Sequence, residues 1–352
     1  MKKLILLALF SIGFGALIAQ NSDLNCKRNI LIMSYNVENL FDTIDDPHKS
    51  DNEFLPTSKK KWTSARYHEK LQHLAEVISS ADTNKLPDLL SLVEVENQLV
   101  LHDLSQQSLL KNGRYKIIHK ESPDRRGIDV ALLYNAKMFK LLDQHFYKVS
   151  LTNDNYFKTR DILYAKLVFK KTKDTLHVFV NHWPSRRGGQ EKSEHKRMRA
   201  AEVLKSVTDS LFKADGNPRI MIMGDFNDEP TDKSIAAILQ VKPINNVNNS
   251  NLYNLSLNKK LQKSGSYYYW KTKEWNMIDQ LIVSGQLINS KKGLQMKSTD
   301  ITILRHDFFL YTDKKGIKSP AKTYGGKRYY GGYSDHLPIY FYLYYKCKLV
   351  EN

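Results

Sequence analysis

The residues of this sequence that could do chemistry are short polar side chains at the borders of apolar runs. They are Asn36, Glu94, Asp225, Asn227, Asp279, Asp335 and His336. Turns favour Asp and Asn because these side chains bond to the local backbone, and that structural explanation would suffice for any one position. It explains the whole set poorly, since the same kind of residue recurs at one border after another. We therefore interpret the set as parts of one active site.

These residue types suit the hydrolysis of a phosphodiester. The reaction needs a divalent cation to neutralise the phosphate, a base to activate water, and a proton donor or metal for the leaving oxygen. Carboxylate and Asn oxygens are the ligands that Mg²⁺ prefers, and Mn²⁺ or Ca²⁺ would accept the same ligands. His182 and His336 can transfer protons near neutral pH. The sequence thus contains each group that the reaction requires.

Apolar periodicity predicts the elements that must position these groups. Strands are expected at 29–36, 89–93, 128–134, 162–169, 175–181, 219–223, 266–270, 277–283 and 337–345. Helices are expected at 65–80, 98–110 and 190–212. Many strands with a few long helices indicate two sheets packed face to face and covered by helices. Residues 285–333 are rich in Lys, Gly and Tyr, and we interpret them as a long surface excursion of functional importance.

Short motifs run in order along nearly the whole chain: Ser34–Asn39, Leu92–Asn97, Gly127–Ala131, Asn181–Ser185, Gly224–Asn227, Ile278–Asp279 and Ser334–His336. Together they resemble the endonuclease/exonuclease/phosphatase superfamily, which includes the DNase I-like nucleases. The resemblance implies an α+β fold, a four-layer α/β/β/α sandwich in which helices flank two mostly antiparallel sheets. The segments around Asn36, Asp129 and His182 look closest to those of bacterial secreted or membrane nucleases.

The resemblance also implies roles for individual residues. Glu94 resembles the principal metal ligand, with Asn36 and Asp335 as further ligands. Asp225 and Asn227 resemble the pair that orients the attacking water or holds a second metal. The resemblance therefore implies a site for one or two divalent cations.

Two histidines complete the implied site. His336 resembles a histidine whose ring is held by an aspartate, here Asp279. His182 resembles the second catalytic histidine, and Asp129 stands where the acidic partner of that histidine is expected. Asp129 lies within an apolar strand, and a buried acid needs a partner. A nearby arginine is the alternative partner for Asp129.

Two arginines are expected to bind substrate phosphate. Arg160 matches a phosphate-contacting arginine of the family, with a surface ion pair as the alternative. Arg186 belongs to a basic cluster beside the His182 motif. Glu38 and Glu96 are interpreted as supporting or surface residues rather than ligands, and Asp228 as a residue that orders the Asn227 loop.

The charge of the chain bears on its substrate. The formal net charge is +17, which suits either a polyanionic partner or a generally basic, solvated surface. Residues 322–333 alternate Lys and Arg with Tyr, so they could contact phosphates and stack on bases. We expect a nuclease acting on DNA or RNA. A lipid or sugar-phosphate hydrolase is the alternative, and an inactive nucleic-acid-binding or adhesion module is the third.

The two ends of the chain predict its destination. Lys2-Lys3 precede an apolar run that ends at Ala19, which is typical of a secretory signal peptide. We expect a signal peptide at 1–19, a short lead at 20–28, and one domain at 29–348. The mature protein is expected to be a secreted or periplasmic monomer without stable membrane insertion. Cys26 and Cys347 are the two cysteines, and the implied fold would bring them together as a disulfide.

Overall fold

Two large sheets form the body of the protein. The computed structural model describes residues 27–346, in which six strands pair in the order β13-β18-β1-β2-β4-β3 and six in the order β5-β6-β7-β8-β12-β9. The first sheet contains β1 (Lys27–Leu40), β2 (Leu89–Val95), β3 (Tyr115–His119), β4 (Asp129–Asn135), β13 (Thr302–Ile303) and β18 (Ile339–Lys346). The second contains β5 (Phe139–Tyr147), β6 (Ile162–Phe169), β7 (Thr175–His182), β8 (Ile220–Asp225), β9 (Leu252–Asn254) and β12 (Asp279–Ser284). The β1–β2 and β7–β8 pairs are parallel and the other pairs in these sheets are antiparallel.

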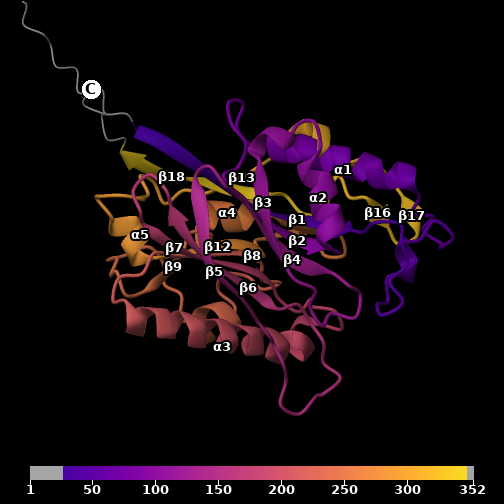
Figure 1. Ribbon diagram of the computed structural model, residues 1–352. Coiled ribbons are helices and arrows are strands. Elements are labelled where there is room, and N and C mark those ends of the chain that lie inside the picture. Colours follow the sequence, from indigo (N-terminus) through magenta and orange to yellow (C-terminus); the bar gives the residue numbers. More distant parts are fainter. Residues whose placement is uncertain (1–26, 347–352) are drawn as a thin grey trace, which may run out of the picture.

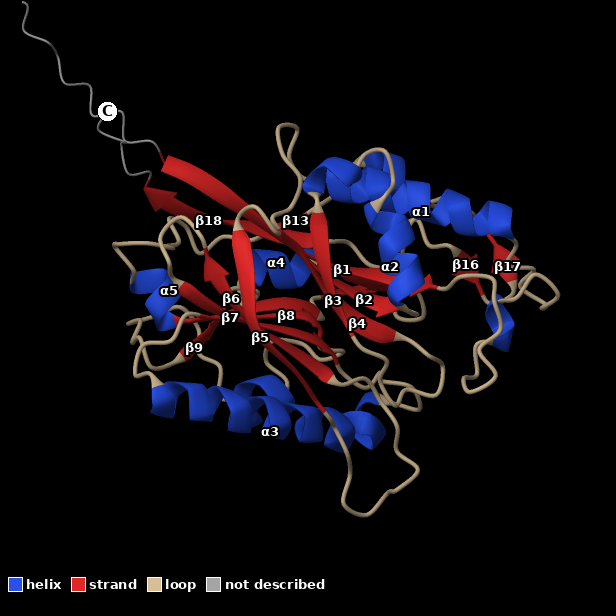
Figure 2. Ribbon diagram, in the orientation of Figure 1, coloured by secondary structure: helices blue, strands red, loops and turns tan. Residues whose placement is uncertain are grey.

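Helices cover the outer faces of the two sheets. In Figure 1, α1 and α2 lie on one side of the strands and α3 runs along the opposite side, and Figure 2 shows the same layers by type of structure. The helices are α1 (Ser64–Ser79), α2 (Gln98–Ser105), α3 (Gln190–Ala214), α4 (Lys259–Ser264) and α5 (Gly285–Asn289). The expected four-layer α/β/β/α sandwich is confirmed.

The core consists of two apolar clusters, and successive residues of one strand belong alternately to one cluster and the other. On β8, Met221 and Met223 belong to the larger apolar cluster, which includes buried residues of both sheets and of α1. Ile220 and Ile222 belong to a second cluster, where the second sheet packs against Ala200 and other residues of α3. Successive strand residues point to opposite faces, so both faces of β8 are buried. This explains why β8 reads in the sequence as a continuous apolar run.

The segments before and after β12 are more structured than the sequence predicts. Three two-stranded hairpins lie outside the large sheets: β10 (Tyr267–Tyr269) with β11 (Glu274–Asn276), β14 (Leu310–Thr312) with β15 (Lys318–Pro320), and β16 (Tyr324–Gly325) with β17 (Arg328–Tyr329). Residues 285–333 were expected to form a surface excursion, yet Ile303, Leu304 and Phe309 are buried in the larger core cluster. That expectation was wrong for these side chains, because short apolar stretches without periodicity carry little signal.

One further expectation differs from the structure. The helix expected at 98–110 ends at Ser105, where Gln106 closes it with backbone bonds to His102 and Leu104.

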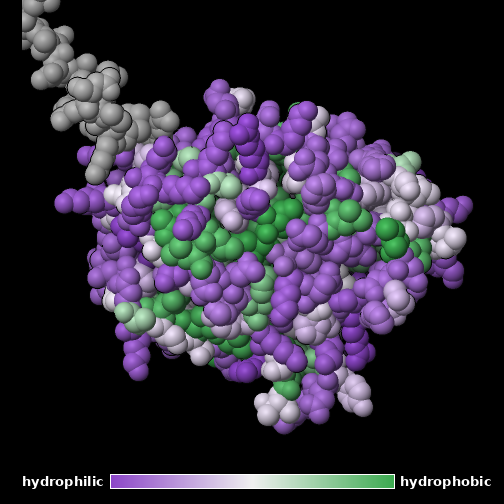
Figure 3. Space-filling view, viewed as in Figure 1, coloured by the Kyte–Doolittle hydropathy of each residue, from purple (hydrophilic) through white to green (hydrophobic). Residues whose placement is uncertain are grey.

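Hydrophilic residues cover most of the face seen in Figure 3, and hydrophobic residues gather in its middle, over the strands. Within residues 27–346, no helix has the length and apolarity needed to cross a bilayer. The expected signal peptide and both cysteines lie outside the described residues.

Candidate active site

The site forms where the same ends of the central strands meet. β7 and β8 run parallel, and their last residues, His182 and Asp225, pair in the register. β12 runs antiparallel to β8, so its first residue, Asp279, pairs with Asp225. In the other sheet β18 runs antiparallel to β1, which brings the turn before β18 to the end of β1. There the Ser334 hydroxyl donates a hydrogen bond of 2.7 Å to the Asn36 carbonyl.

Glu94 occupies an irregularity near the end of β2. The pairing of β2 with β4 shifts between Val93 and Val95, and Glu94 between them has a φ of 66°. Few residues other than glycine adopt this left-handed conformation, which often occurs at functional sites. Oε2 of Glu94 accepts a hydrogen bond of 3.0 Å from the backbone N–H of Asn39. The bulge and this bond together fix the direction of the carboxylate.

Asp225 connects the two sheets. The glycine before it, Gly224, has a φ of 131°, and a Cβ at this position would collide with the backbone of Asn181 on β7. Only glycine allows this close approach of the two strands. Oδ1 of Asp225 accepts the backbone N–H of Asn227 at 2.8 Å, and Oδ2 accepts Nδ2 of Asn36 at 3.1 Å. The second bond crosses from the β8 sheet to the β1 sheet, so both sheets hold this carboxylate.

Two histidine rings flank the same oxygen of Asp225. Nε2 of His182 lies 3.8 Å from Oδ2 of Asp225 and 3.8 Å from Oε1 of Glu94. Nε2 of His336 lies 3.9 Å from Oδ2 of Asp225 and 3.9 Å from Oδ1 of Asp335. Each ring therefore faces Asp225 and one carboxylate that is expected to bind a metal ion. That carboxylate is Glu94 for His182 and Asp335 for His336. We call Asp225, Asp279 and the two histidines the catalytic group, and Glu94, Asp335 and Asn36 the metal-ligand group.

The other nitrogen of His336 is tightly held. Nδ1 lies 2.7 Å from Oδ2 of Asp279, and the same oxygen accepts a hydrogen bond of 2.6 Å from the hydroxyl of Ser266. Asp279 and His336 are both buried. A buried carboxylate on one ring nitrogen fixes the orientation of the imidazole and strengthens the other nitrogen as a proton donor or acceptor.

The two histidines differ in charge because their surroundings differ. Burial alone would lower the pKa of His336, but the carboxylates of Asp279, Asp335 and Asp225 outweigh it and raise that pKa well above its usual value. Burial lowers the pKa of His182 well below its usual value, and the positive charge of Arg160 adds to this effect. These opposite shifts favour the charged form of His336 and the neutral form of His182.

The carboxylates of the site crowd one another. Burial raises the pKa of Asp225 to about 7, with the charges of Asp279 and Glu94 acting in the same direction and His336 opposing them. Burial also raises the pKa of Asp335, where the nearby charge of Glu94 adds to the effect and His336 opposes it. Groups with such shifts gather at functional sites.

The residues present fit a divalent cation. Glu94, Asp335 and Asn36 offer hard oxygen donors, and the surplus of negative charge around them is what a cation such as Mg²⁺ would neutralise. Ligand atoms of Asp225, Asp279 and His336 also lie within 4.8 Å of one another, so this group is a second place that could hold an ion. The chemistry of the donor set is thus that of a metal-assisted hydrolase.

A family model described as Endonuclease/Exonuclease/phosphatase family matches residues 31–345. The chain belongs to this family. Its members are hydrolases that act on phosphoester bonds, and they typically depend on divalent metal ions. None of the curated proteins matches the chain at a significant level.

Several solved structures of the endonuclease/exonuclease/phosphatase family have the same fold. The chain is similar to a family member from Bacteroides thetaiotaomicron, with 15% identity and a TM-score of 0.56 over 91% of this chain and 96% of that one. The B. thetaiotaomicron mannosyl-6-phosphatase has 16% identity and a TM-score of 0.55, covering 89% and 99% of the two chains. D. rerio TDP2 complexed with single strand DNA product has 14% identity and a TM-score of 0.54, covering 90% and 98%. At these identities the likeness shows the fold.

The structure corrects the expected partner of His182. Oδ1 of Asp129 accepts the backbone N–H of Ser122 at 2.9 Å, and Oδ2 lies 3.3 Å from Nε2 of His119. Nδ1 of His182 has no hydrogen-bond partner among the described residues. The predicted pairing of Asp129 with His182 was wrong, because β3 brings His119 beside β4 and apolar periodicity did not predict β3. Asp129 lies in the family motif, but its carboxylate contacts Ser122 and His119 and not the catalytic histidines.

Arg160 supports the backbone of the site. Its Nε donates to the His182 carbonyl at 3.2 Å, one terminal nitrogen donates to the Trp183 carbonyl at 2.6 Å, and the other donates to Oδ2 of Asp124 at 2.9 Å. Arg160 is buried, and these three bonds engage three of the five N–H groups of its guanidinium. Its contact with substrate phosphate remains a prediction. Arg186 donates to the Asn227 carbonyl at 2.6 Å and stays partly exposed, so its phosphate contact remains a prediction.

Two supporting residues, Ser266 and Tyr267, were not expected from the sequence, whereas Glu38 was expected to be a supporting or surface residue. The Tyr267 ring lies 4.8 Å from the His336 ring between centroids, and Ser266 next to it bonds Asp279. Glu38 is buried and accepts the backbone N–H groups of Thr323 and Tyr324. No spacing in the sequence links Tyr267 to His336 or Glu38 to Thr323. The partial signal was Glu38 itself, which stands two residues after Asn36.

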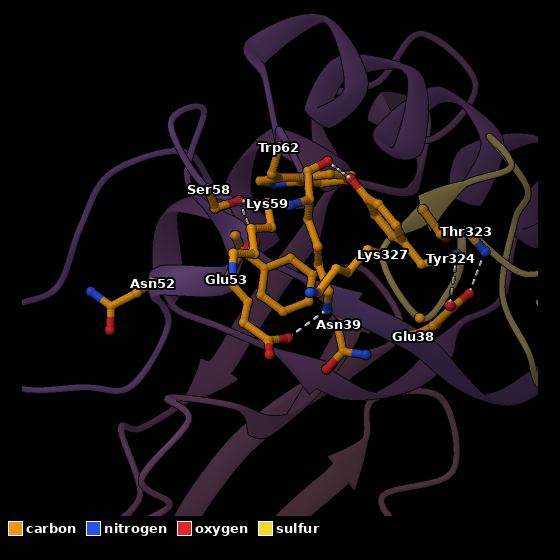
Figure 4. A pocket seen from close by; sticks show the side chains of 13 residues that line it. Glu38, Asn39, Asn52, Glu53, Ser58, Lys59, Trp62, Thr323, Tyr324 and Lys327 are labelled. Atoms are coloured by element: carbon orange, nitrogen blue, oxygen red, sulfur yellow. Dashed lines mark hydrogen bonds and ion pairs between the residues drawn. The ribbon is translucent and has the colours of Figure 1, made fainter.

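A pocket of about 650 Å³ opens beside the metal-ligand group. Figure 4 shows Glu38 and Asn39 from the end of β1, Trp62 and Tyr324 around this pocket, with Tyr324 next to Glu38. The ammonium of Lys60 lies 4.1 Å from the centre of the Phe54 ring in the wall. The backbone N–H of Asn39 is the one that bonds Glu94, so the pocket adjoins the proposed metal ligand.

Proposed function

We propose that this chain is a secreted phosphodiesterase that uses a divalent cation to hydrolyse nucleic acid. One observation carries the proposal: Nε2 of His182 and Nε2 of His336 both face Oδ2 of Asp225, and the same two atoms also face the carboxylates of Glu94 and Asp335. Proton-transfer groups of different charge around a set of hard metal ligands are what metal-assisted attack of water on phosphorus requires.

The metal ligands and the water-activating group have separate tasks. Held by Glu94, Asp335 and Asn36, a cation such as Mg²⁺ would neutralise phosphate charge and polarise the phosphorus–oxygen bonds. Asp225 takes the proton of the attacking water, and a pKa of about 7 suits a base that works near neutral pH. The backbone N–H of Asn227 holds the other oxygen of Asp225 and so fixes the direction of attack.

The histidines complete the reaction. His336 directs its Nε2 into the site as a charged donor, where it hydrogen-bonds a phosphate oxygen or gives a proton to the leaving oxygen. Asp279 keeps this imidazole protonated and oriented. His182 remains neutral, and its Nε2 faces the space between Glu94 and Asp225.

Nucleic acid is the proposed substrate because of charge and surface. The chain carries a formal net charge of +17, which favours a polyanion. A structural neighbour, TDP2, is complexed with single strand DNA product. The second candidate is a sugar phosphate, since another neighbour is a mannosyl-6-phosphatase and the pocket beside Glu38 has room for a sugar. We further propose that residues 1–19 direct secretion and that the mature protein is a monomer.

A substrate panel tests this proposal. The purified mature protein is incubated with plasmid DNA, with RNA, with a sphingolipid and with mannose 6-phosphate, each in Mg²⁺ or in EDTA. We expect cleavage of DNA or RNA in Mg²⁺ and none in EDTA. Release of phosphate from mannose 6-phosphate, with intact nucleic acid, would establish the second candidate instead. If every substrate stays intact, the enzyme proposal fails.

A further inference from the structure

An exposed aromatic surface borders the active site on the side of His336. It consists of Trp270, Tyr311, Lys322, Arg328 and Tyr330, which line a groove of about 570 Å³ and which we call the aromatic platform. Tyr330 is 54% exposed, Tyr311 51% and Trp270 38%. Large exposed aromatic side chains that gather in one groove often mark a surface that binds a partner or ligand.

The aromatic platform is continuous with the catalytic group. Tyr267, whose ring lies 4.8 Å from the His336 ring, belongs to the β10–β11 hairpin, and Trp270 lies in the turn of that hairpin. The Trp270 and Tyr311 rings lie 6.1 Å apart. Lys322 precedes Thr323, whose backbone N–H donates a hydrogen bond of 2.6 Å to Glu38, two residues after the proposed ligand Asn36. A molecule lying on the aromatic platform would therefore lie beside the active site.

The cations of the aromatic platform lie beside its rings. The Lys322 ammonium lies 5.8 Å from the Trp270 ring centre, and the Arg328 guanidinium lies 5.4 Å from the Tyr330 ring centre. Neither has an ion-pair partner among residues 27–346, so both charges are available to an anion. Positive charge that alternates with exposed rings complements a chain of phosphates that alternates with flat bases.

The hairpin that carries the cations is held from the other side. Lys70 on α1 is buried and donates to the Thr323 hydroxyl at 2.7 Å and to the Tyr333 carbonyl at 2.5 Å. Glu38 accepts the backbone N–H groups of Thr323 and Tyr324, bonds that Figure 4 shows as dashed lines. Figure 1 shows the β16–β17 hairpin beside α1. The hairpin is thus fixed before any ligand binds, which lowers the cost of binding.

We propose that the aromatic platform binds the unpaired bases of single-stranded nucleic acid and leads the strand into the active site. This inference rests on the proposed nuclease function and specifies the form of its substrate. Stacking requires exposed base faces, which a duplex hides between its base pairs, whereas the neighbouring cations serve the phosphates of either form. A single strand can therefore bind both the exposed rings and the cations of the aromatic platform, whereas a duplex can bind only the cations.

Binding in EDTA tests the inference apart from cleavage. Fluorescence anisotropy is measured with the full mature protein and a labelled oligonucleotide, as a single strand and as its blunt duplex. We expect Trp270→Ala and Tyr330→Ala each to weaken single-strand binding by about 5- to 100-fold, the usual effect of removing one stacked base. Tyr330→Phe keeps the ring and should bind like the wild type. Arg328→Glu, at an exposed position, should weaken both forms.

The matched control is Tyr344→Ala. Tyr344 also has a lysine over its ring, Lys297 at 3.9 Å, but it lies near the far end of β18. It should bind both forms like the wild type. Hydrolysis of bis(p-nitrophenyl) phosphate in Mg²⁺ should be unchanged in Trp270→Ala and Tyr330→Ala, which shows that both fold and that the site is intact.

The outcomes separate the two proposals. Equal loss for duplex and single strand, unchanged binding in both aromatic variants, or binding of anionic lipid vesicles in place of the oligonucleotide would each overturn the inference, even if the enzyme cleaves DNA. Weakened single-strand binding in a protein that cleaves no nucleic acid would support the aromatic platform and refute the nuclease function.

Discussion

Nδ1 of His336 lies 2.7 Å from Oδ2 of Asp279, although 57 residues separate the two in the sequence. Both side chains are buried, and Ser266 adds a hydrogen bond to the same carboxylate oxygen. The pair joins the two sheets, because Asp279 begins β12 and His336 precedes β18. This contact orients the histidine and, among the three carboxylates that raise its pKa, Asp279 acts most strongly, so the Asp279–His336 pair is tested first.

Replacing Asp279 by Asn should lower turnover by at least about 100-fold, the low end for lost acid–base catalysis. An amide cannot keep His336 charged, although its size and hydrogen-bonding capacity are similar. The measurement is kcat on a cleaved substrate in Mg²⁺, with the unfolding temperature of each variant. Asp209→Asn is the control, since Asp209 lies exposed on α3 and, among residues 27–346, its only ion pair is with Lys205. Turnover within about threefold of wild type would show that the charge of His336 is unimportant.

The two histidines should each be essential. His182→Ala and His336→Ala are expected to lower turnover by at least about 100-fold, because each removes a group that faces the Asp225 carboxylate. The same kinetic assay checks this, with circular dichroism to confirm folding. A near-normal rate for either variant would show that its ring takes no part in proton transfer.

Arg160 should act on stability and turnover rather than on substrate affinity. In Arg160→Lys the charge remains, but the ammonium cannot reproduce the three bonds to His182, Trp183 and Asp124. We expect the free energy of unfolding to fall by at least about 2 kcal/mol, since a hydrogen bond with a charged group contributes about 1.5–3 kcal/mol. Urea unfolding and steady-state kinetics measure both effects. A raised KM with unchanged stability would instead support the role in phosphate binding.

The parts of this site that could be predicted from the sequence are those with a local pattern, whereas contacts between residues far apart in the sequence could not be predicted. Asn36, Glu94, Asp225 and His336 could be found because strand ends and turns have a local signature. The hydrogen bond between Asn36 and Asp225 depends on how two sheets face each other, which no local pattern encodes. Asp129 shows the same limit, since its partner His119 comes from a strand that the sequence pattern did not reveal. The long helices and buried strands were predicted well because their periodicity extends over many residues.

His177 should make the fold less stable in mild acid. It is buried on β7 beside the Tyr164 hydroxyl, and burial lowers its pKa from 6.5 to about 4, with the charge of Lys166 acting in the same direction. The folded state therefore favours neutral His177, and its contribution is complete above pH 6.5 and is lost as the pH falls toward 4. Between pH 7.5 and pH 5 this should remove up to about 2 kcal/mol of unfolding free energy.

Urea unfolding of wild type and His177→Gln at the two pH values checks this prediction. Gln can accept the Tyr164 hydroxyl but does not titrate, so its loss of stability between the two pH values should be smaller by about 1–2 kcal/mol. An identical loss in the variant would mean that other groups cause the acid sensitivity.

The two cysteines should form a disulfide, which remains a prediction because both lie outside the described residues. Lys27 of β1 pairs with Lys346 of β18, and Cys26 and Cys347 are the next residues outward in the sequence. Cα atoms of paired antiparallel residues lie about 4.5–5.5 Å apart, a separation that a disulfide spans. Thiol titration of the unfolded mature protein, purified without reductant, should find no free thiol. Two free thiols per chain would refute the bond.

Glu94 provides the most direct test of the central claim, that this is a cation-dependent hydrolase of nucleic acid. Cleavage of a labelled single-stranded oligonucleotide is followed for wild type and Glu94→Gln in Mg²⁺, and for wild type after EDTA dialysis and after Mg²⁺ is restored. We expect no cleavage in EDTA, full recovery with Mg²⁺, and a rate at least about 100-fold lower for Glu94→Gln, because this change removes the charge of a principal metal ligand. Undiminished cleavage in EDTA together with an active Glu94→Gln would contradict it.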